Sequence, residues 1–325
     1  MQPARLQPGD EVRIIAPSTS MAVVKGEQVK LATERLESFG FRVTFGRYVD
    51  EHDMFFSTSV ENRMEDLHDA FRDPNVKAIF TAIGGYNVNQ LLSHIDFELI
   101  KENPKILCGY SDITALQLAI YAKTGLITYS GPAFSTFGMK HLTDYVVQGM
   151  LTALTNDAPF EFEPSDQWSD DKWYLEQDQR TYYLNSGHLI VREGKAEGRL
   201  IGGNLGTINL LQGTEFMPSL KNAVLFIEDD NESHLMTFDR QLQSLLHLPD
   251  AKDLKAVLIG RFQKESNVTE SALITLLENK PELAHIPVIA NLDFGHTDPL
   301  ATLPIGGWAE IVAENGKTDI LISGN

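Results

Sequence analysis

Ser111 lies in the stretch of the sequence best suited to nucleophilic chemistry, KILCGYSDITALQLAIYA, residues 105–122. The run from Ile106 to Tyr110 is apolar or small and predicts a buried strand, after which apolar residues repeat at helical spacing. A serine at such a strand-to-helix turn has its hydroxyl at the carboxyl edge of a sheet. There it lies beside the free N–H groups and the positive dipole end of the following helix, and both favour an attacking alkoxide.

The pattern around Ser111 matches the nucleophile turn of hydrolases only in part. Gly109 stands two residues before the serine, but Ile113 occupies the place of the second glycine of that motif. On this stretch alone, a purely structural role is favoured, in which Ser111 or Asp112 caps the helix.

A base and a carboxylate that could activate a serine lie in the second half of the chain. A serine hydroxyl needs a neighbouring base at neutral pH, and the base needs a third group that orients it and stabilises its charged form. His296 follows the apolar run PVIA, and Glu228 follows the run AVLFI. Spacing does not show that these side chains meet. A loop histidine is more often solvated, and Glu228 has two acidic neighbours that are typical of a solvated turn.

Other reactive residues indicate no further centre. Cys108 is the single cysteine and is expected to be a small core residue of the predicted strand. The remaining histidines lack zinc-type spacing, so the sequence predicts no metal and no cofactor. The run GGNLG at residues 202–206 departs from the dinucleotide fingerprint, and we expect it to line a pocket in which Asn204 contacts substrate. Arg261 could supply positive charge to an anionic substrate, although a structural ion pair is the more usual role.

Composition limits the possible partners. The chain has 325 residues and a net charge of −18, so it repels phosphate backbones and anionic lipid surfaces; we expect neither nucleic-acid nor membrane binding. One cysteine permits no internal disulfide, and the amino terminus has no apolar signal-peptide core. These features predict a cytoplasmic protein.

The elements that must position these residues predict an α/β protein. In the first half, strands alternate with helices, which indicates a mostly parallel, doubly wound sheet. Ligands bind such sheets at the carboxyl ends of strands, where Gly84, Gly85 and Ser111 would lie. In the second half, short strands and helices indicate a mixed α+β domain that closes with a hairpin around Asn315 and Gly316.

A change in composition and periodicity divides the chain into two parts. Residues 156–180 are acidic, aromatic and without periodicity, which is typical of a linker or an ordered functional loop. We therefore expect an N-terminal α/β domain over residues 1–155 with the nucleophile, and a C-terminal domain over residues 181–325 with Glu228 and His296.

Five blocks in a fixed order resemble the LD-carboxypeptidase family of serine peptidases, which includes the microcin C immunity peptidases. The resemblance spans nearly the whole chain, and the blocks are Gly84-Gly85-Tyr86, Gly109-Tyr110-Ser111-Asp112, Gly202-Gly203-Asn204-Leu205, Phe226-Ile227-Glu228-Asp229, and Gly295-His296 followed by Leu303-Pro304-Ile305-Gly306.

The resemblance implies a role for each matching residue. Ser111 would be the nucleophile, His296 the general base and then acid, and Glu228 the residue that orients His296, with the active site at the interface of the two domains. The backbone N–H groups of Gly85 and Asp112 would stabilise the oxyanion. The family also suggests a homodimer.

Details favour the microcin-immunity branch. Tyr86, which we expect to bind substrate, is followed by Asn87-Val88-Asn89, where the murein enzymes resemble one another in a GGYG-type block. The loop before Arg180 carries two tryptophans. In that branch a loop aromatic stacks on the substrate's nucleobase, for which Trp173 is the first candidate and Trp168 the second. Alternatively, both tryptophans pack a domain or subunit contact. His188 stands where that branch often has an aromatic residue.

We therefore expect a cofactor-free serine peptidase that hydrolyses an amide through an acyl-enzyme. Its small-molecule substrate would be a peptidyl or aminoacyl nucleotide of the microcin C type. Two alternatives remain at this point: a murein tetrapeptide from which D-alanine is released, and a noncatalytic protein that binds a small molecule in its cleft.

Overall fold

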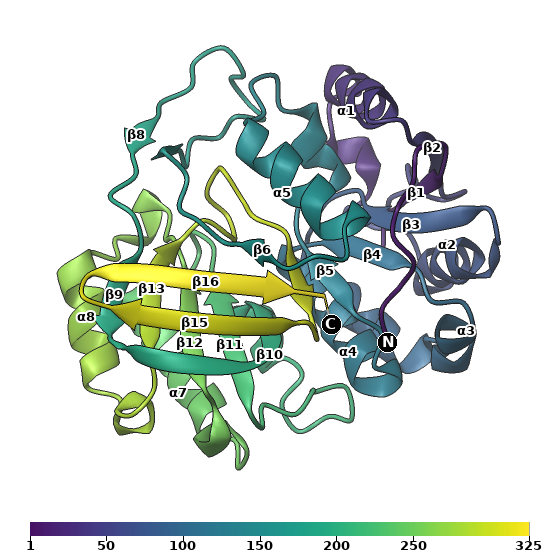
Figure 1. The fold of residues 1–325 in the computed structure, drawn as a ribbon. Helices are drawn as coiled ribbons and strands as arrows, with labels where there is room; N and C mark the ends of the chain where they lie inside the picture. Colours follow the sequence, from purple (N-terminus) through teal and green to yellow (C-terminus); the bar gives the residue numbers. More distant parts are fainter. Residues whose placement is uncertain (325) are drawn as a thin grey trace.

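The structure, a computed structural model, describes residues 1–324, which form two large sheets and the helices that cover them (Figure 1). A third, two-stranded sheet pairs β7 (Gln167–Trp168) with β8 (Tyr183–Leu184) in the loop between the two halves. The strands of the first sheet are β1 (Glu11–Ile15), β2 (Arg42–Phe45), β3 (Val76–Thr81), β4 (Ile106–Gly109), β5 (Thr128–Ser130) and β14 (Leu303–Ile305). Their order is β14-β5-β4-β3-β1-β2, and all pair in parallel except β14.

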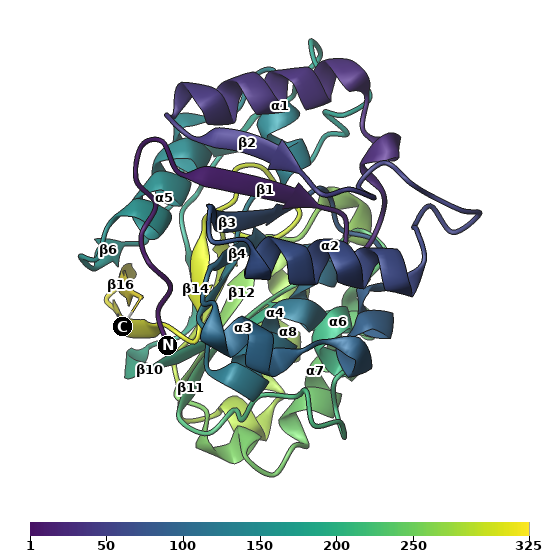
Figure 2. The ribbon, with the colours of Figure 1, turned by 90° about the vertical axis from the view of Figure 1, so that its right-hand side faces the viewer.

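Helices cover both faces of the first sheet, as the alternating pattern predicts (Figure 2). Residues 1–324 contain the α-helices α1 (Gly26–Ser38), α2 (Val60–Arg72), α3 (Phe97–Glu102), α4 (Thr114–Thr124), α5 (Asp144–Thr155), α6 (Leu205–Asn209), α7 (Leu235–Leu246) and α8 (Glu270–Glu278), of which α6 to α8 lie between strands of the second sheet. Buried side chains of α1 and α5 pack on one face of the sheet, and those of α2, α3 and α4 pack on the other. β3 and β4 are buried on both faces except at Lys77, and most of their residues are therefore apolar or small.

The second sheet is mixed, as expected. Its strands are β6 (Phe160–Glu161), β9 (Leu189–Arg192), β10 (Gly194–Asn204), β11 (Ala223–Glu228), β12 (Ala256–Gly260), β13 (Val288–Leu292), β15 (Trp308–Glu314) and β16 (Lys317–Ser323). The order is β6-β16-β15-β10-β11-β12-β13-β9, in which β10 to β13 are parallel and the flanking strands antiparallel. The predicted terminal hairpin is confirmed as β15 and β16.

Three features join the two sheets. β14 comes from the second half of the chain but pairs with β5 of the first sheet, with Leu303 opposite Ser130. The N–H of Asn204, at the end of β10, donates to the Thr114 hydroxyl at the start of α4, at 3.0 Å. One apolar core also runs through both halves, from Leu116 of α4 to Leu200 of β10 and beyond.

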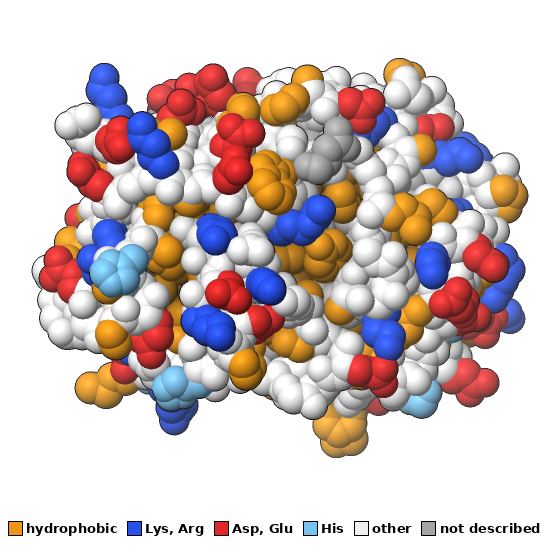
Figure 3. Space-filling model, turned by 60° about the horizontal axis from the view of Figure 1, so that its bottom comes forward, with side chains coloured by type: hydrophobic (Ala, Val, Ile, Leu, Met, Phe, Trp, Pro, Cys, Tyr) orange, Lys and Arg blue, Asp and Glu red, His pale blue; other side chains and the backbone are white. Residues whose placement is uncertain are grey.

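Charge is mixed on the surface of the face shown in Figure 3, where acidic and basic side chains lie among each other and among apolar ones. Within residues 1–324, no helix combines the length and the apolar character needed to cross a bilayer.

The contact between β10 and β11 gives a test of the packing. Gly202 faces the backbone of Phe226 so closely that an added methyl group would overlap the Phe226 carbonyl oxygen, whereas Gly149 in α5 has open space around it. We expect Gly202→Ala to lower the free energy of unfolding by about 3 kcal/mol or more. Gly149→Ala should raise it by about 0.5 to 1 kcal/mol, because alanine favours the helix. Urea unfolding midpoints measure both, and equal midpoints would contradict this account.

Candidate active site

Ser111 lies at a sharp turn directly between β4 and α4. Its φ is +66°, in the left-handed region that a residue with a side chain rarely adopts and that costs about 1 to 2 kcal/mol. Glycines make room around it. A methyl group on Gly84 would lie 3.1 Å from Ser111 Oγ, and one on Gly109 would overlap the Thr81 hydroxyl. The turn therefore presents the hydroxyl at the carboxyl edge of the first sheet, although Ile113 replaces the motif's second glycine.

The structure brings Ser111, His296 and Glu228 together. The Ser111 hydroxyl lies 3.0 Å from His296 Nε2, and His296 Nδ1 lies 2.7 Å from Glu228 Oε2. Glu228 is the last residue of β11 and is 4% exposed, so it does not belong to a solvated turn. A methyl group on Gly295 would lie 2.6 Å from Glu228 Oε2, which explains why a glycine precedes the histidine.

The surroundings of His296 favour its charged form. Burial pulls the pKa of the imidazole down, but the charge of Glu228 and its hydrogen bond outweigh this effect and raise the pKa above 6.5. With Glu228 ionised, Nδ1–H donates to the carboxylate, which leaves Nε2 to accept a proton from the Ser111 hydroxyl. This tautomer is the one that a general base for Ser111 requires.

The two backbone N–H groups expected to stabilise the oxyanion are those of Asp112 and Gly85. Asp112 N–H lies in the first turn before α4, where backbone donors have no helical acceptor. Gly85 N–H donates to no acceptor within residues 1–324. The carboxylate of Asp112 has a separate role, because it accepts hydrogen bonds from the Ser18 hydroxyl at 2.5 Å and from Val88 N–H at 2.9 Å. It thereby fixes the loops after β1 and β3 against the turn.

Two cavities meet at Ser111. The larger has a volume of about 570 Å³ and is lined by His296 and Trp173, among others. The smaller has a volume of about 290 Å³ and is lined by Asn204 and several acidic residues. Gly85, Tyr86 and Ser111 line both cavities.

The predicted substrate residues differ in their placement. Tyr86 is 75% exposed, and its hydroxyl donates to Glu232 at 2.6 Å across the junction of the two cavities. The side-chain oxygen of Asn204 accepts from the N–H of Thr207 and caps α6, while the residue also lines the smaller cavity. Trp173 lines the larger cavity.

Trp168 lies in a packed cluster and is not among the residues, within 1–324, that line either cavity. Its ring contacts Tyr183, with centroids 5.1 Å apart, and the Arg261 guanidinium lies 5.0 Å from its centroid. His188 is likewise outside the two linings; it contacts the Thr318 hydroxyl at 2.8 Å, and burial lowers its pKa to about 4. The sequence analysis ranks Trp173 ahead of Trp168 as the residue that stacks on the substrate, but their different surroundings arise from tertiary contacts.

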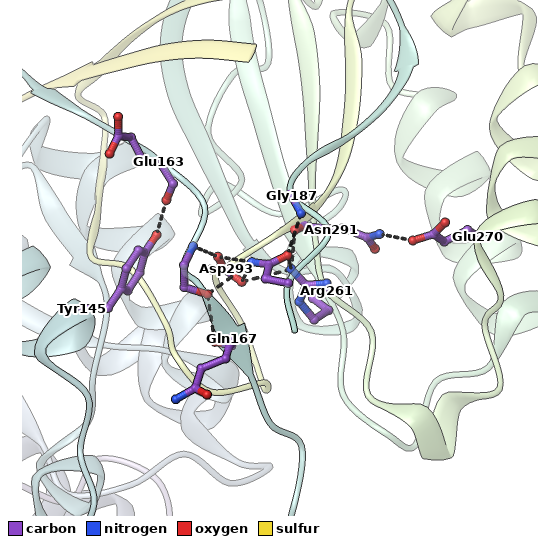
Figure 4. A network of polar contacts seen from close by, with 10 residues as sticks. Tyr145, Glu163, Gln167, Gly187, Arg261, Glu270, Asn291 and Asp293 are labelled. Carbon is purple, nitrogen blue, oxygen red and sulfur yellow. Dashed lines mark hydrogen bonds and ion pairs between the residues drawn. The ribbon is translucent and has the colours of Figure 1, made fainter. Parts of the chain in front are cut away.

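A buried ionic network anchors the loop that carries the tryptophans (Figure 4). Asp293 is fully buried and accepts hydrogen bonds from Ser165 N–H at 2.7 Å and from the Asn185 amide at 3.0 Å. Arg261 pairs with Asp293 at 3.2 Å and also binds the Asn185 side chain. Arg261 is therefore a structural cation in this network, and the loop is fixed at both of its ends.

A second set of contacts joins this loop to the segment that carries His296. The backbones of Ser169 and Asp298 exchange two hydrogen bonds, of 2.7 and 2.8 Å. Arg180 pairs with the Asp298 carboxylate at 2.8 Å and with Asp171 at 2.6 Å. The sequence analysis does not predict the role of Asp298; the only signal is its position two residues after His296.

Acidic residues after Glu228 were also not predicted to be part of the site. Asp229 is 6% exposed, and burial raises the pKa of its carboxyl to about 7. Within residues 1–324, no group of three His, Cys, Asp or Glu side chains is arranged to hold a metal ion.

Two sequence profiles match this chain. The profile described as the LD-carboxypeptidase N-terminal domain matches residues 12–131, and the profile of the LD-carboxypeptidase C-terminal domain matches residues 197–311. The fold and the matches define a peptidase. The chain belongs to the LD-carboxypeptidase family, the serine peptidases of family S66.

Relatives and solved structures extend the match over the whole chain. The chain is 53% identical to a Bacillus subtilis protein named as a carboxypeptidase, YocD, covering 99% of each chain. It is 33% identical to the microcin C7 self-immunity protein MccF of Escherichia coli, covering 98% of this chain and 94% of MccF. The crystal structure of an MccF-like protein from Bacillus anthracis has a TM-score of 0.98 at 50% identity, covering 100% of both chains.

Two further structures bear on possible substrates. MccF in complex with aspartyl sulfamoyl adenosine matches with a TM-score of 0.90 at 31% identity, covering 100% of this chain and 99% of that one. The muramoyltetrapeptide carboxypeptidase of Oxalobacter formigenes matches with a TM-score of 0.77 at 27% identity, covering 96% of this chain and 98% of that one. The chain is thus more similar in structure to the MccF protein.

The contact between His296 and Glu228 generates a test that needs no substrate. We expect the imidazole of His296 to titrate above 6.5 in the wild type, and Glu228→Gln to lower its pKa, because the amide carries no charge to stabilise the imidazolium. NMR shifts of the ring across pH measure both values, and the exposed His141 provides an internal control. An unchanged pKa of His296 in the variant would contradict the assigned contact.

Proposed function

We propose that this peptidase uses Ser111 as its nucleophile, His296 as general base and acid, and Glu228 to orient His296. The observation that carries the proposal is the continuous hydrogen-bonded chain from Glu228 through His296 to Ser111. Its order and atoms are those that nucleophilic serine catalysis requires.

The reaction would proceed in two steps. Ser111 Oγ attacks the amide carbonyl carbon while its proton passes to His296 Nε2, and the N–H groups of Gly85 and Asp112 stabilise the oxyanion. As the C–N bond breaks, the imidazolium gives that proton to the leaving nitrogen, which leaves an ester on Ser111. Water then attacks the ester with His296 as base, and the acid and free enzyme are released. Each oxyanion donor would contribute about 3 to 4 kcal/mol to transition-state stabilisation.

The proposed substrate is an aminoacyl or peptidyl nucleotide of the microcin C type. Support comes from the similarity to MccF, which has been crystallised with aspartyl sulfamoyl adenosine, and from Trp173 in the larger cavity. An indole can stack on any nucleobase, at about 1 to 3 kcal/mol per base. The similarity to a muramoyltetrapeptide carboxypeptidase supports a second candidate, the release of D-alanine from a murein tetrapeptide.

Substitution of the nucleophile tests the proposal directly. We expect the wild type to cleave aspartyl sulfamoyl adenosine at its aminoacyl amide, and Ser111→Ala to lose more than about 10³-fold in kcat while it still binds the compound. Chromatography of the released nucleoside measures turnover, and D-alanine release from a murein tetrapeptide is measured in parallel. Cleavage of the tetrapeptide alone would establish the second candidate. Binding without turnover of either compound by the wild type would instead indicate a noncatalytic binding protein.

The two tryptophans provide a matched pair. Trp173→Ala should raise the KM for the nucleotide substrate by about 5- to 150-fold, since stacking on the base is lost. Trp168→Ala should instead lower the free energy of unfolding by about 1 to 3 kcal/mol, because its ring packs on Tyr183 and Arg261. Steady-state kinetics and urea unfolding on both variants separate the two effects. A larger rise in KM for Trp168→Ala than for Trp173→Ala would reverse the assignment.

A further inference from the structure

The two cavities at Ser111 can be assigned to the two halves of an amide substrate. His296 lines only the larger cavity, within the described residues. In the proposed reaction the imidazolium protonates the leaving nitrogen, so the leaving group must lie on the side of His296. The acyl half is then left with the smaller cavity, whose volume of about 290 Å³ is sufficient for one amino-acid residue.

The smaller cavity is acidic. Of the residues within 1–324 that line it, the acidic and basic ones are all carboxyl groups, Asp112, Asp229, Asp230 and Glu232, and none is a lysine, arginine or histidine. Because burial raises the pKa of Asp229 to about 7, this group is only partly ionised at neutral pH. Asp112 is already occupied by the Ser18 hydroxyl and Val88 N–H. The other three follow Glu228 on one loop and have no basic partner in the cavity that offsets their charge.

Asp229 has a free acceptor in this cavity. The side chain is only 6% exposed, and Oδ1 accepts from Asp230 N–H at 3.1 Å. Oδ2 is buried without a hydrogen-bond partner within residues 1–324. The buried Ser233 hydroxyl in the same cavity lies close enough to favour the charged form of Asp229, and it too has no hydrogen-bond partner within residues 1–324. Buried polar atoms are rarely left unsatisfied, so this pair indicates polar groups that arrive with a ligand. Glu232 adds a second carboxylate, which the Tyr86 hydroxyl holds at the junction of the cavities.

We propose that the smaller cavity binds an ammonium group on the acyl half of the substrate, with Asp229 Oδ2 as acceptor and Glu232 as a second anionic partner. The proposal rests on the proposed function and defines its substrate further. An ammonium group supplies both the donors and the positive charge that this cavity lacks, whereas an acyl half without a cation would leave its carboxylates uncompensated. The group is either the free α-amine of an aminoacyl unit or the side-chain amine of a basic residue.

Two pairs of sulfamoyl adenosines distinguish these sources. Alanyl and N-acetylalanyl compounds differ in the α-ammonium, and lysyl and norleucyl compounds differ in the side-chain ammonium. We expect kcat/KM of the wild type to fall about tenfold or more when the ammonium is removed in at least one pair, and that pair identifies the source. A change of less than about twofold in both pairs would overturn the proposal.

Variants locate the effect in the cavity. Glu232→Gln and Asp229→Asn should each reduce the preference for the charged member of the pair, while Glu310→Gln, which removes an exposed carboxylate on β15, should retain it. Equal discrimination in all three variants would place recognition elsewhere and contradict the proposal.

Binding measurements separate a failure of the proposed reaction from a failure of the proposed ammonium site. The affinity of the Ser111→Ala protein for the same four compounds, measured by calorimetry, does not depend on turnover. If the wild type cleaves none of them, the proposed function fails for this substrate class, and equal affinities within both pairs would also overturn the ammonium site. Tighter binding of a charged member would support it.

Discussion

The hydrogen bonds between Glu228, His296 and Ser111 join the two sheets. The rest of the structure must hold the two sheets in a fixed relative position so that these hydrogen bonds can form. Glu228 is the last residue of one strand of the second sheet and His296 follows another, whereas Ser111 follows a strand of the first. Contacts of 2.7 and 3.0 Å tolerate little relative movement of the two layers. The shared apolar core and the hydrogen bond from Asn204 to Thr114 supply this rigidity close to the site, since Thr114 begins the helix that follows Ser111. The proposed chemistry thus depends on packing between distant parts of the chain.

Glycine permits the close approaches on which this geometry depends. Gly84 lies against Ser111, and Gly295 lies against the carboxylate of Glu228. At both positions a side chain would displace a group of the relay, and Gly295 also has a φ of +101°. The left-handed turn at Ser111 itself is tolerated because the buried strand β4 and the helix α4 hold it from both sides.

Local sequence patterns predicted the elements on which the site residues lie, but not the meeting of those residues. The apolar run before Ser111 and the helical spacing after it are local signals, and so are the strands before Glu228 and His296. The contact between His296 and Ser111 spans 185 positions, so no local pattern encodes it; the family resemblance supplied that expectation. Burial of Asp229 and the different surroundings of Trp168 and Trp173 depend on tertiary contacts and were not predictable in the same way.

Local sequence patterns did not predict some helices and strands, or predicted them only in part, and the physical reason differs for each. The sequence analysis does not predict α5, in which Gly149 and two adjacent valines weaken the helical signal. Of β10, only Arg199 to Ile201 are predicted as a strand, because the first part carries Gly194, Lys195 and Glu197 and is exposed on alternate residues. β14 has three residues, one of them a proline, and so resembles a loop until its pairing with β5 is seen.

The position of β14 has a consequence for how the polypeptide can be divided. Residues 1–155, produced alone, would lack the strand that covers β5 and would expose an unpaired, apolar sheet edge, a known template for aggregation. The remaining piece would carry residues 303–305 with no strand to pair with. Two such fragments should stay in solution only when they are synthesised together, so that each completes the other's hydrogen bonding during folding.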